Sequence, residues 1–302
     1  MGESSYLSLY TSGELQRRAE QALTLIKHCR LCPRECGVDR SAGERGYCHT
    51  GRMARVASYA PHFGEESPLV GRFGSGTIFF SCCNLLCSFC QNYDISHGGH
   101  GVEVNPSDLA AMMIALQERG CHNINFVTPT HVVPQILEGL VVACERGLTV
   151  PLVYNTSGYE RLETLKLLDG IFDIYMPDFK FWDDERSLRY CNAPDYRDRT
   201  IEAIAEMYRQ VGDLTIDTGG IATRGLLVRH LVMPGGTADV EGIMRFLATA
   251  ISTGTYVNIM DQYHPCGRAG NDTSINRRIS MEEFTHAVKT AHRAGLRRLD
   301  RG

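Results

Sequence analysis

The strongest constraint on the fold is an alternation of short apolar runs with helical patterns that begins at Thr77. Six runs have the length and composition of buried strands: Thr77–Cys82, Asn123–Thr128, Leu152–Asn155, Ile174–Pro177, Leu226–Met233 and Val257–Met260. The helical patterns are Pro106–Arg119, Val132–Arg146, Gly158–Leu168, Glu185–Tyr190, Tyr196–Val211, Val240–Thr253 and Met281–Ala294. Repeated βα units are typical of a parallel sheet, and periodicity alone leaves a partial barrel and a doubly wound sheet open. In both folds, functional groups gather where the strands end.

The first 75 residues do not show this alternation of strand and helix patterns. A helix is predicted over Ser12–His28, with Ser12 as its N-cap. Residues 29–75 are rich in Gly, Pro, Cys and Arg and have no sustained periodicity, so an irregular segment stapled by a metal is expected. We therefore predict an N-terminal Cys-rich extension over residues 1–75 and an α/β core over residues 76–302.

Composition excludes several classes of protein. With 43% hydrophobic residues and a net charge of -4, the 302-residue chain has the make-up of a soluble globular protein with no bias toward nucleic acid. No segment approaches the roughly 18 uninterrupted apolar residues of a membrane helix, and the first twenty residues lack the apolar centre of a signal peptide. We expect a cytoplasmic protein without a membrane partner.

The chain contains twelve cysteines, which stay reduced in the cytoplasm and there indicate metal binding or catalysis. Eight of them form two groups: Cys29, Cys32, Cys36 and Cys48, and then Cys82, Cys83, Cys87 and Cys90. The sequence therefore predicts two candidate metal sites.

The second group directly follows the first predicted strand, and Cys83, Cys87 and Cys90 form a C-x3-C-x2-C motif. Three soft sulfur ligands suit an iron–sulfur cluster or zinc. A closed site normally takes four protein ligands, so three leave one metal position for a substrate or cofactor. Cys82 does not complete the set, because adjacent strand residues point to opposite faces. A zinc knuckle or simply buried cysteines are the alternatives.

With this motif after the first of six βα units, the chain resembles the radical S-adenosylmethionine (SAM) superfamily, and more closely its pyruvate formate-lyase activating enzyme group. The finer match lies in residues 74–80, 91–93, 178–180, 229–235 and 260–264, and the resemblance runs from about residue 25 to the C-terminus. It implies a partial (β/α)6 TIM-like barrel as the core.

The resemblance also implies the chemistry. In this superfamily three cysteines, here Cys83, Cys87 and Cys90, hold three irons of a [4Fe-4S] cluster, and SAM chelates the fourth iron. One electron, from a donor such as flavodoxin or ferredoxin, cleaves SAM, and the 5′-deoxyadenosyl radical abstracts a hydrogen atom. In the activating enzymes the hydrogen comes from a glycine of a protein partner.

Further residues are carried over from relatives as contacts of SAM. Phe89 corresponds to an aromatic residue near the adenine. Relatives carry Gly-Gly-Glu for the methionine amino group at the end of the second strand; this chain lacks it, which leaves Thr128, Thr130 or backbone carbonyls. Asn155 stands at the end of the third strand, in place of a charged ligand.

The fourth and fifth strands add three candidates. Asp178 and Lys180 are two residues apart, so their side chains share a face, and the ammonium group can pair with the methionine carboxylate. A surface salt bridge is the alternative. His230 is a candidate cofactor contact on the fifth strand, although a lone strand histidine is often a hydrogen-bonded core residue.

The first cysteine group offers four thiolates. Cys29, Cys32, Cys36 and Cys48 fit a closed tetrahedral zinc site or an auxiliary [4Fe-4S] cluster. Zinc is favoured, because a metal staple explains how residues 29–60 fold without a periodic core. Four unligated thiols are the alternative.

We therefore expect an enzyme, a radical SAM oxidoreductase of the activating type with a protein substrate. Modification of a small molecule or peptide is an alternative within the same chemistry. A non-catalytic zinc or iron–sulfur binding module is the alternative from a different class, and a nucleic-acid modifier ranks last because the chain has no basic excess.

Overall fold

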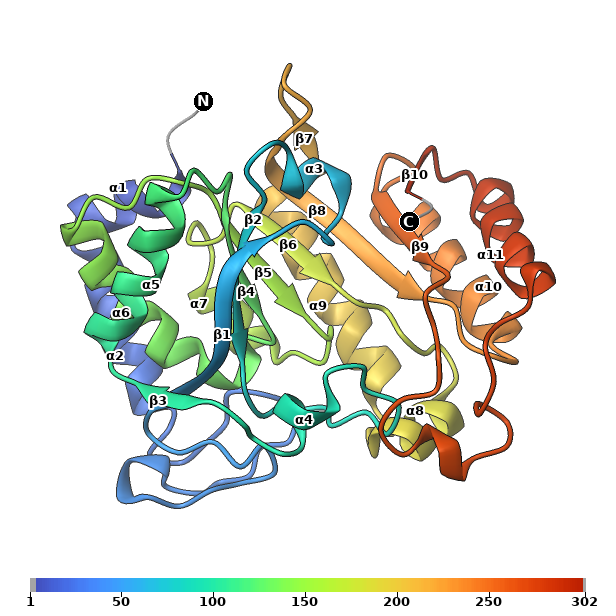
Figure 1. The fold of residues 1–302 in the computed structure, drawn as a ribbon, viewed down its shortest axis with the longest axis horizontal. Helices are drawn as coiled ribbons and strands as arrows, with labels where there is room; N and C mark the ends of the chain where they lie inside the picture. The colour runs from blue at the N-terminus through green and yellow to red at the C-terminus, as the bar shows by residue number, and fades with distance from the viewer. Residues whose placement is uncertain (1–3, 301–302) are drawn as a thin grey trace.

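The computed structural model describes residues 4–300, apart from the side chains of residues 237 and 238. A curved sheet lies between helices and long loops (Figure 1). Its strands are β1 (Ala54–His62), β2 (Ser75–Phe80), β3 (Val102–Val104), β4 (Ile124–Val127), β5 (Leu152–Thr156), β6 (Ile174–Pro177), β7 (Thr215–Ile216), β8 (Ala222–Leu231), β9 (Tyr256–Met260) and β10 (Arg298–Asp300). The six predicted strands are all present, as β2, β4, β5, β6, β8 and β9.

The strand order is β10-β9-β8-β6-β5-β4-β2-β1-β3, and every neighbouring pair from β10 to β2 is parallel. β5 and β6 are buried at every position. Parallel strands covered on both faces read as continuous apolar runs, which is why the sequence predicted them. The mostly parallel sheet confirms the predicted partial barrel, and its strands end at one common edge.

The prediction of an irregular segment over residues 29–75 is wrong in its second half. β1 pairs antiparallel with β2, and β3 pairs antiparallel with β1. Ala54 and Val56 are buried, but the following residues of β1 are largely exposed. Because only one end of the strand enters the core, its sequence lacks the apolar run that identifies a buried strand.

The main helices are α1 (Ser5–Thr11), α2 (Glu14–Thr24), α5 (Pro106–Glu118), α6 (Val133–Glu145), α7 (Leu162–Leu167), α8 (Asp184–Cys191), α9 (Tyr196–Val211), α10 (Thr237–Phe246) and α11 (Met281–Ala294); α3 (Ser67–Val70) and α4 (Tyr93–Ser96) are single turns. Asn105 and Ser280 both begin their helices with a capping box, as their sequences indicate. The predicted cap at Ser12 is wrong. Two helices replace one, and Gly13, with φ 76°, is the N-cap of α2.

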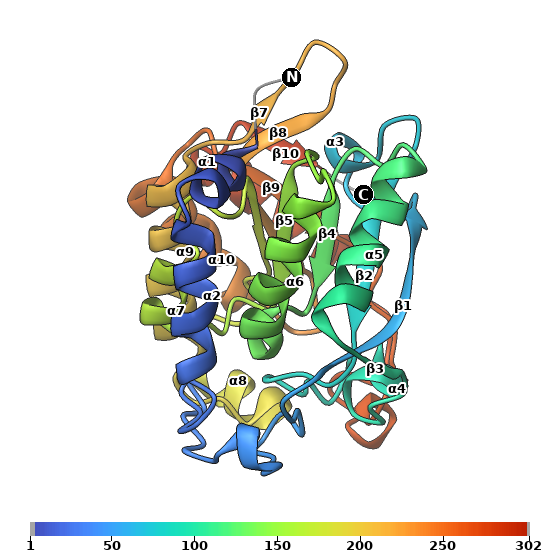
Figure 2. The ribbon, with the colours of Figure 1, turned by 90° about the vertical axis from the view of Figure 1, so that its left-hand side faces the viewer.

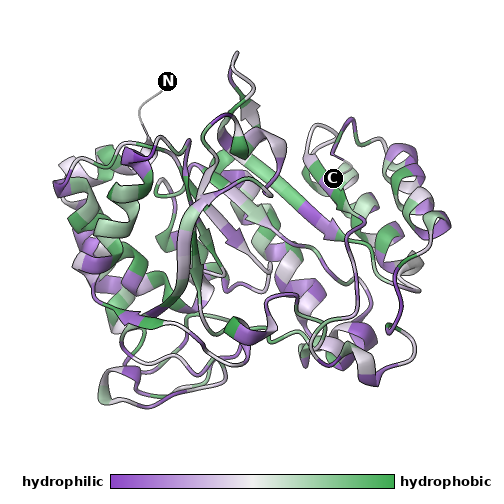
Figure 3. Ribbon diagram, in the orientation of Figure 1, coloured by the Kyte–Doolittle hydropathy of each residue, from purple (hydrophilic) through white to green (hydrophobic). Residues whose placement is uncertain are grey.

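The segment that precedes β1 runs along the outside of the core (Figure 2). α1, α2 and α6 cover one side of the sheet, and the Cys-rich segment then passes under the end at which the strands terminate, close to α8. Hydrophobic residues concentrate on the strands and inner helix faces, whereas the end of β8 is hydrophilic (Figure 3). None of the helices between residues 4 and 300 is long and apolar enough to cross a membrane.

Gly158 provides a test of the packing at the strand ends. Its φ is +80°, and a Cβ there would collide with the Asp178 carbonyl oxygen and lie 2.9 Å from Thr200 Cγ2. Gly147 has a similar φ of +87° but open space around it. Both alanine variants carry the backbone cost of about 1 kcal/mol, but only Gly158→Ala adds overpacking of roughly 1–3 kcal/mol.

Urea unfolding of the two variants measures this difference in the free energy of unfolding. Equal destabilisation by Gly158→Ala and Gly147→Ala would contradict the described contact between Gly158 and Asp178.

Candidate functional site

The loop over residues 81–90 connects β2 to α4 at the edge where the parallel strands end. Two of its residues have left-handed backbone conformations, Cys82 with φ 71° and Leu86 with φ 55°. These turns, with the Cys90 N–H bonded to the Cys87 carbonyl at 3.2 Å, fold the loop back on itself. We call Cys83, Cys87 and Cys90 the triad.

The triad thiols are shielded from water and each has a polar neighbour. The Leu85 N–H lies 3.3 Å from Cys83 Sγ, the Cys191 thiol 3.4 Å from Cys87 Sγ, and the Ser96 hydroxyl 3.3 Å from Cys90 Sγ. Burial raises the pKa of Cys83 to about 12 and raises that of Cys90, and the Cys191 hydrogen bond and burial raise that of Cys87. Neutral buried thiols are poor nucleophiles, and a metal group bound here would displace their protons, since the metal ligand is the thiolate.

The triad offers three soft sulfur ligands on one loop. Such a set suits an iron–sulfur cluster or zinc, and three protein ligands leave one metal position open.

A buried network of charged and polar groups lies at the same edge of the sheet. Asp178 accepts a hydrogen bond from Lys180 Nζ at 2.5 Å through Oδ2 and from Arg229 Nε at 2.8 Å through Oδ1. Arg229 Nη2 also donates to Asn155 Oδ1 at 2.8 Å. Burial acts to raise the pKa of Asp178, but Arg229 and Lys180 outweigh it and lower that pKa. Arg229 Nη1 also lies 3.8 Å from Glu66 Oε1, so the network combines two carboxylates with two cations.

The network adjoins the triad. Lys180 and Cys87 are close enough for their charges to influence each other. Thr128, at the end of β4, donates its N–H to the Asn155 carbonyl at 2.9 Å and has φ 62°, a strained conformation for a β-branched residue. The structure therefore brings together Thr128, Asn155, Asp178 and Lys180, as the sequence predicted.

Phe89 and His230 occupy different surroundings. Phe89 is buried and meets Phe181 edge-on, with ring centroids 5.8 Å apart, and it also contacts Tyr190 and Tyr263. His230 is buried, and its Nδ1 lies 2.7 Å from the Phe179 carbonyl oxygen. Neighbouring strand residues point to opposite faces, so Arg229 rather than His230 joins the network through hydrogen bonds.

Glu160 is a buried carboxylate that the sequence analysis missed. It accepts hydrogen bonds from the hydroxyl groups of Thr130, Thr156 and Tyr154, and burial raises its pKa to about 7. Its neighbour Tyr159 accepts a 2.8 Å hydrogen bond from Asn84, which stands next to Cys83. A single glutamate in a loop is normally exposed, so no sequence signal distinguished it.

The sequence model of the radical SAM superfamily matches residues 77–247, which contain the triad and the network. This chain belongs to the radical SAM superfamily. It is also 32% identical over 292 residues to an uncharacterized protein of Methanocaldococcus jannaschii, an alignment that covers 93% of this chain and 79% of the relative. The superfamily implies a [4Fe-4S] cluster and SAM.

Two solved structures share the fold. A radical SAM methyltransferase from Sphaerobacter thermophilus has a TM-score of 0.51 at 17% identity, over 76% of this chain and 67% of that chain. SuiB of Streptococcus suis, bound to its precursor peptide SuiA, has a TM-score of 0.51 at 13% identity, over 73% of this chain and 47% of that chain. This similarity supports the barrel assignment of the radical SAM core.

Glu160 predicts a specific dependence of stability on pH. Its pKa is about 7 in the folded protein against an ordinary value of 4.5, so the folded state holds the proton more tightly and stability falls as pH rises between these values. The loss amounts to at most roughly 3 kcal/mol. Glu160→Gln removes this loss, so the variant should gain stability relative to the parent protein between pH 4.5 and 7.5.

Urea unfolding across this pH range tests the prediction. Glu163→Gln is the matched control, since its side chain is 65% exposed in the same segment and it should follow the parent protein. A parallel pH dependence in Glu160→Gln and the parent would contradict the buried, proton-binding carboxyl group.

Proposed function

We propose that this chain is a radical SAM enzyme in which Cys83, Cys87 and Cys90 bind a [4Fe-4S] cluster with one open iron. When bound, the reduced cluster and SAM supply a carbon-centred radical that abstracts a hydrogen atom from the substrate. The observation that carries the proposal is the triad on the loop after β2, inside the segment that matches the superfamily, with Cys83 and Cys87 buried and Cys90 half-buried.

The remaining groups at this edge would bind and orient SAM. Lys180 supplies a half-buried cation beside Cys87 that can pair with the methionine carboxylate, while Asp178 holds the ammonium group in place. Arg229 and Asn155 extend the same hydrogen-bonded surface.

Glu160 and Phe89 complete the proposed SAM site. Glu160, with the hydroxyl of Thr130, offers oxygen acceptors to the methionine amino group in a chain that lacks Gly-Gly-Glu. Phe89 and the rings around it exclude water from the adenine side.

The substrate and partners are further parts of the proposal. We infer a protein or peptide substrate, such as a glycyl-radical enzyme, on the resemblance of residues 74–80, 91–93 and 229–235 to activating enzymes. The chemistry requires a one-electron donor of the flavodoxin or ferredoxin class and a reducing compartment such as the cytoplasm. We also propose that the four N-terminal cysteines hold a second metal centre, either zinc or an iron–sulfur cluster.

Formation of 5′-deoxyadenosine tests the role of the triad. Anaerobically reconstituted protein with dithionite and SAM should release 5′-deoxyadenosine, and Cys87→Ala should reduce the rate at least about a hundredfold, since three protein ligands are needed to hold the cluster. Cys82→Ala, in the same loop but outside the motif, should keep the parent rate. Equal rates in Cys87→Ala and Cys82→Ala would contradict the proposal.

Lys180 is tested through the affinity for SAM. Removing a charge-assisted hydrogen bond of about 1.5–3 kcal/mol should raise the KM for SAM of Lys180→Met by roughly tenfold or more, and Lys180→Arg should recover part of the loss. Lys166→Met, which removes an exposed lysine, is the control. An unchanged KM in Lys180→Met would exclude Lys180 from SAM binding.

A further inference from the structure

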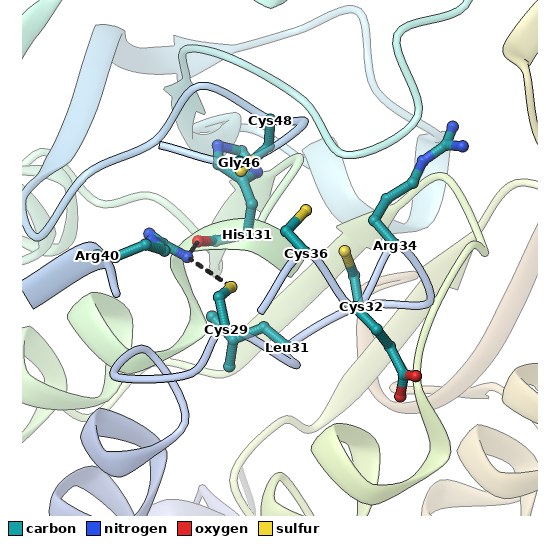
Figure 4. Close-up of a pocket in the computed structure, with 10 residues that line it drawn as sticks. Cys29, Leu31, Cys32, Arg34, Cys36, Arg40, Gly46, Cys48 and His131 are labelled. Atoms are coloured by element: carbon teal, nitrogen blue, oxygen red, sulfur yellow. Dashed lines mark hydrogen bonds between the residues drawn. The ribbon is translucent and has the colours of Figure 1, made fainter. Parts of the chain in front are cut away.

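The four N-terminal cysteines lie around one pocket. Cys29, Cys32, Cys36 and Cys48 line it together with Leu31, Gly46, Arg40 and His131 (Figure 4). Cys29, Cys32 and Cys48 are each only 7% exposed. The segment is therefore folded so that all four thiols border the same shielded space.

Local backbone geometry gives the thiols this arrangement. The Cys29 N–H bonds to the Val38 carbonyl at 2.9 Å, which closes a knuckle around Cys32 and Cys36. Gly46 passes so close that a Cβ there would lie 2.7 Å from Cys36 Sγ. Only glycine allows this approach, and the next N–H, that of Tyr47, lies 3.3 Å from Cys36 Sγ. Backbone N–H groups aimed at sulfur stabilise bound thiolates.

The charge of Arg40 indicates that the pocket holds a negative group. Arg40 is 1% exposed; its guanidinium donates to the carbonyl groups of Gly51 and His131 and lies 3.9 Å from Cys29 Sγ. No carboxylate within residues 4–300 forms an ion pair with it. A buried charge without a counter-charge is costly, and thiolates bound to a metal group supply that counter-charge.

His131 adds an independent observation. Its Nε2 lies 2.9 Å from the Ser81 carbonyl, so Nε2 carries a proton. Its Nδ1 is buried and has no hydrogen-bond partner among the described residues, although the ring borders the pocket. With its proton on Nε2, the ring presents only a lone pair at Nδ1, so His131 marks a polar position on the pocket wall and not a contact with thiolates or sulfides.

The arrangement of the sulfurs and the contact with the triad loop indicate the group. Figure 4 shows the four sulfurs distributed around a common space. Arg34, between Cys32 and Cys36, bonds to the backbone of Asn84 and Cys191 beside the triad. We propose that Cys29, Cys32, Cys36 and Cys48 bind a second [4Fe-4S] cluster, with every iron held by the protein, in place of the zinc that the sequence favoured.

The pocket is joined directly to the triad loop. Arg34, between Cys32 and Cys36, donates from Nε to the Asn84 carbonyl at 3.0 Å and from Nη2 to the Cys191 carbonyl at 2.9 Å. Asn84 is the neighbour of Cys83, and Cys191 contacts Cys87. The two cysteine groups are thus linked through a single arginine side chain.

The two cysteine segments also line one cleft together. A cleft of about 530 Å3 is lined by Tyr47 and His49, which flank Cys48, and by Leu86 and Ser88 of the triad loop. Both cysteine groups therefore approach the same solvent-accessible face of the protein.

A cluster with four protein ligands has no open iron for SAM, so its chemistry is electron transfer. A second cluster held by these four cysteines would take one electron from a flavodoxin- or ferredoxin-type donor, pass it to the cluster held by the triad, and so return to its oxidised state. This relay rests on the proposed function of the triad, whereas the presence of a second cluster does not.

Metal analysis of two variants tests the site. After anaerobic reconstitution with iron and sulfide, the parent protein should hold about eight irons, and Cys83→Ala/Cys87→Ala/Cys90→Ala about four. Cys32→Ala/Cys36→Ala should also hold about four, with an EPR signal that still changes on addition of SAM. Cys121→Ala/Cys144→Ala, which removes two scattered cysteines, should keep all eight.

The triple variant Cys83→Ala/Cys87→Ala/Cys90→Ala, here the triad variant, leaves the N-terminal pocket intact. Its metal content therefore shows whether that pocket holds a cluster, even if Cys32→Ala/Cys36→Ala fails to fold. Zinc without iron in the triad variant, or no metal at all, would overturn the second cluster. A parent protein whose EPR signal ignores SAM while the triad variant still holds iron would instead overturn the proposed function.

Electron transfer between the two proposed clusters is tested by a separate EPR measurement. Two clusters this close should couple magnetically when both are reduced, so the EPR spectrum of the parent protein should be broadened relative to the sum of the two single-cluster variants. A parent spectrum equal to that sum would overturn direct electron transfer between the sites.

Discussion

Parallel strand pairing is the constraint on which this site depends. From β2 to β8 the strands run in the same direction and in close register, so the residues that follow them meet at one edge. Thr128, Asn155 and Asp178 come from three successive strands and are connected there by backbone or side-chain hydrogen bonds. Residues far apart in the sequence become one surface through the sheet alone.

The structure also places several positively charged side chains in shielded positions near the cysteines. Lys180 and Arg229 share Asp178, and Arg229 Nη1 also lies 3.8 Å from Glu66 Oε1. Arg40 has no carboxylate partner among residues 4–300. Buried cations of this kind are stabilised by anionic groups, and a thiolate-bound cluster or the carboxylate of SAM is such a group. The distribution of charge and the positions of the thiols therefore support the same chemistry.

Much of the core could be predicted from the sequence. The buried parallel strands gave unbroken apolar runs, and the position of Cys83, Cys87 and Cys90 directly after the first predicted strand put them on the loop after β2. The pairing of Asp178 with Lys180 was expected from their separation of two residues, although β6 ends at Pro177 and both residues follow it. The helix starts at Asn105 and Ser280 followed from local capping chemistry.

The missed features depend on contacts between distant segments. β1 is half exposed, so its pairing with β2 leaves no apolar pattern. Choosing Arg229 over His230 required the direction in which each side chain points. Glu160 and Arg40 look like ordinary surface residues until tertiary packing buries them. Gly13, not Ser12, is the N-cap of α2, because the chain breaks there between α1 and α2. The sequence pattern did not show this break.

The central claim is that the triad holds a cluster whose open iron binds SAM. Low-temperature EPR of dithionite-reduced protein, recorded anaerobically with and without SAM, tests it most directly. We predict a reduced [4Fe-4S] signal whose g-values shift when SAM is added. A triad signal that is indifferent to SAM, or no iron signal after reconstitution, would contradict the account.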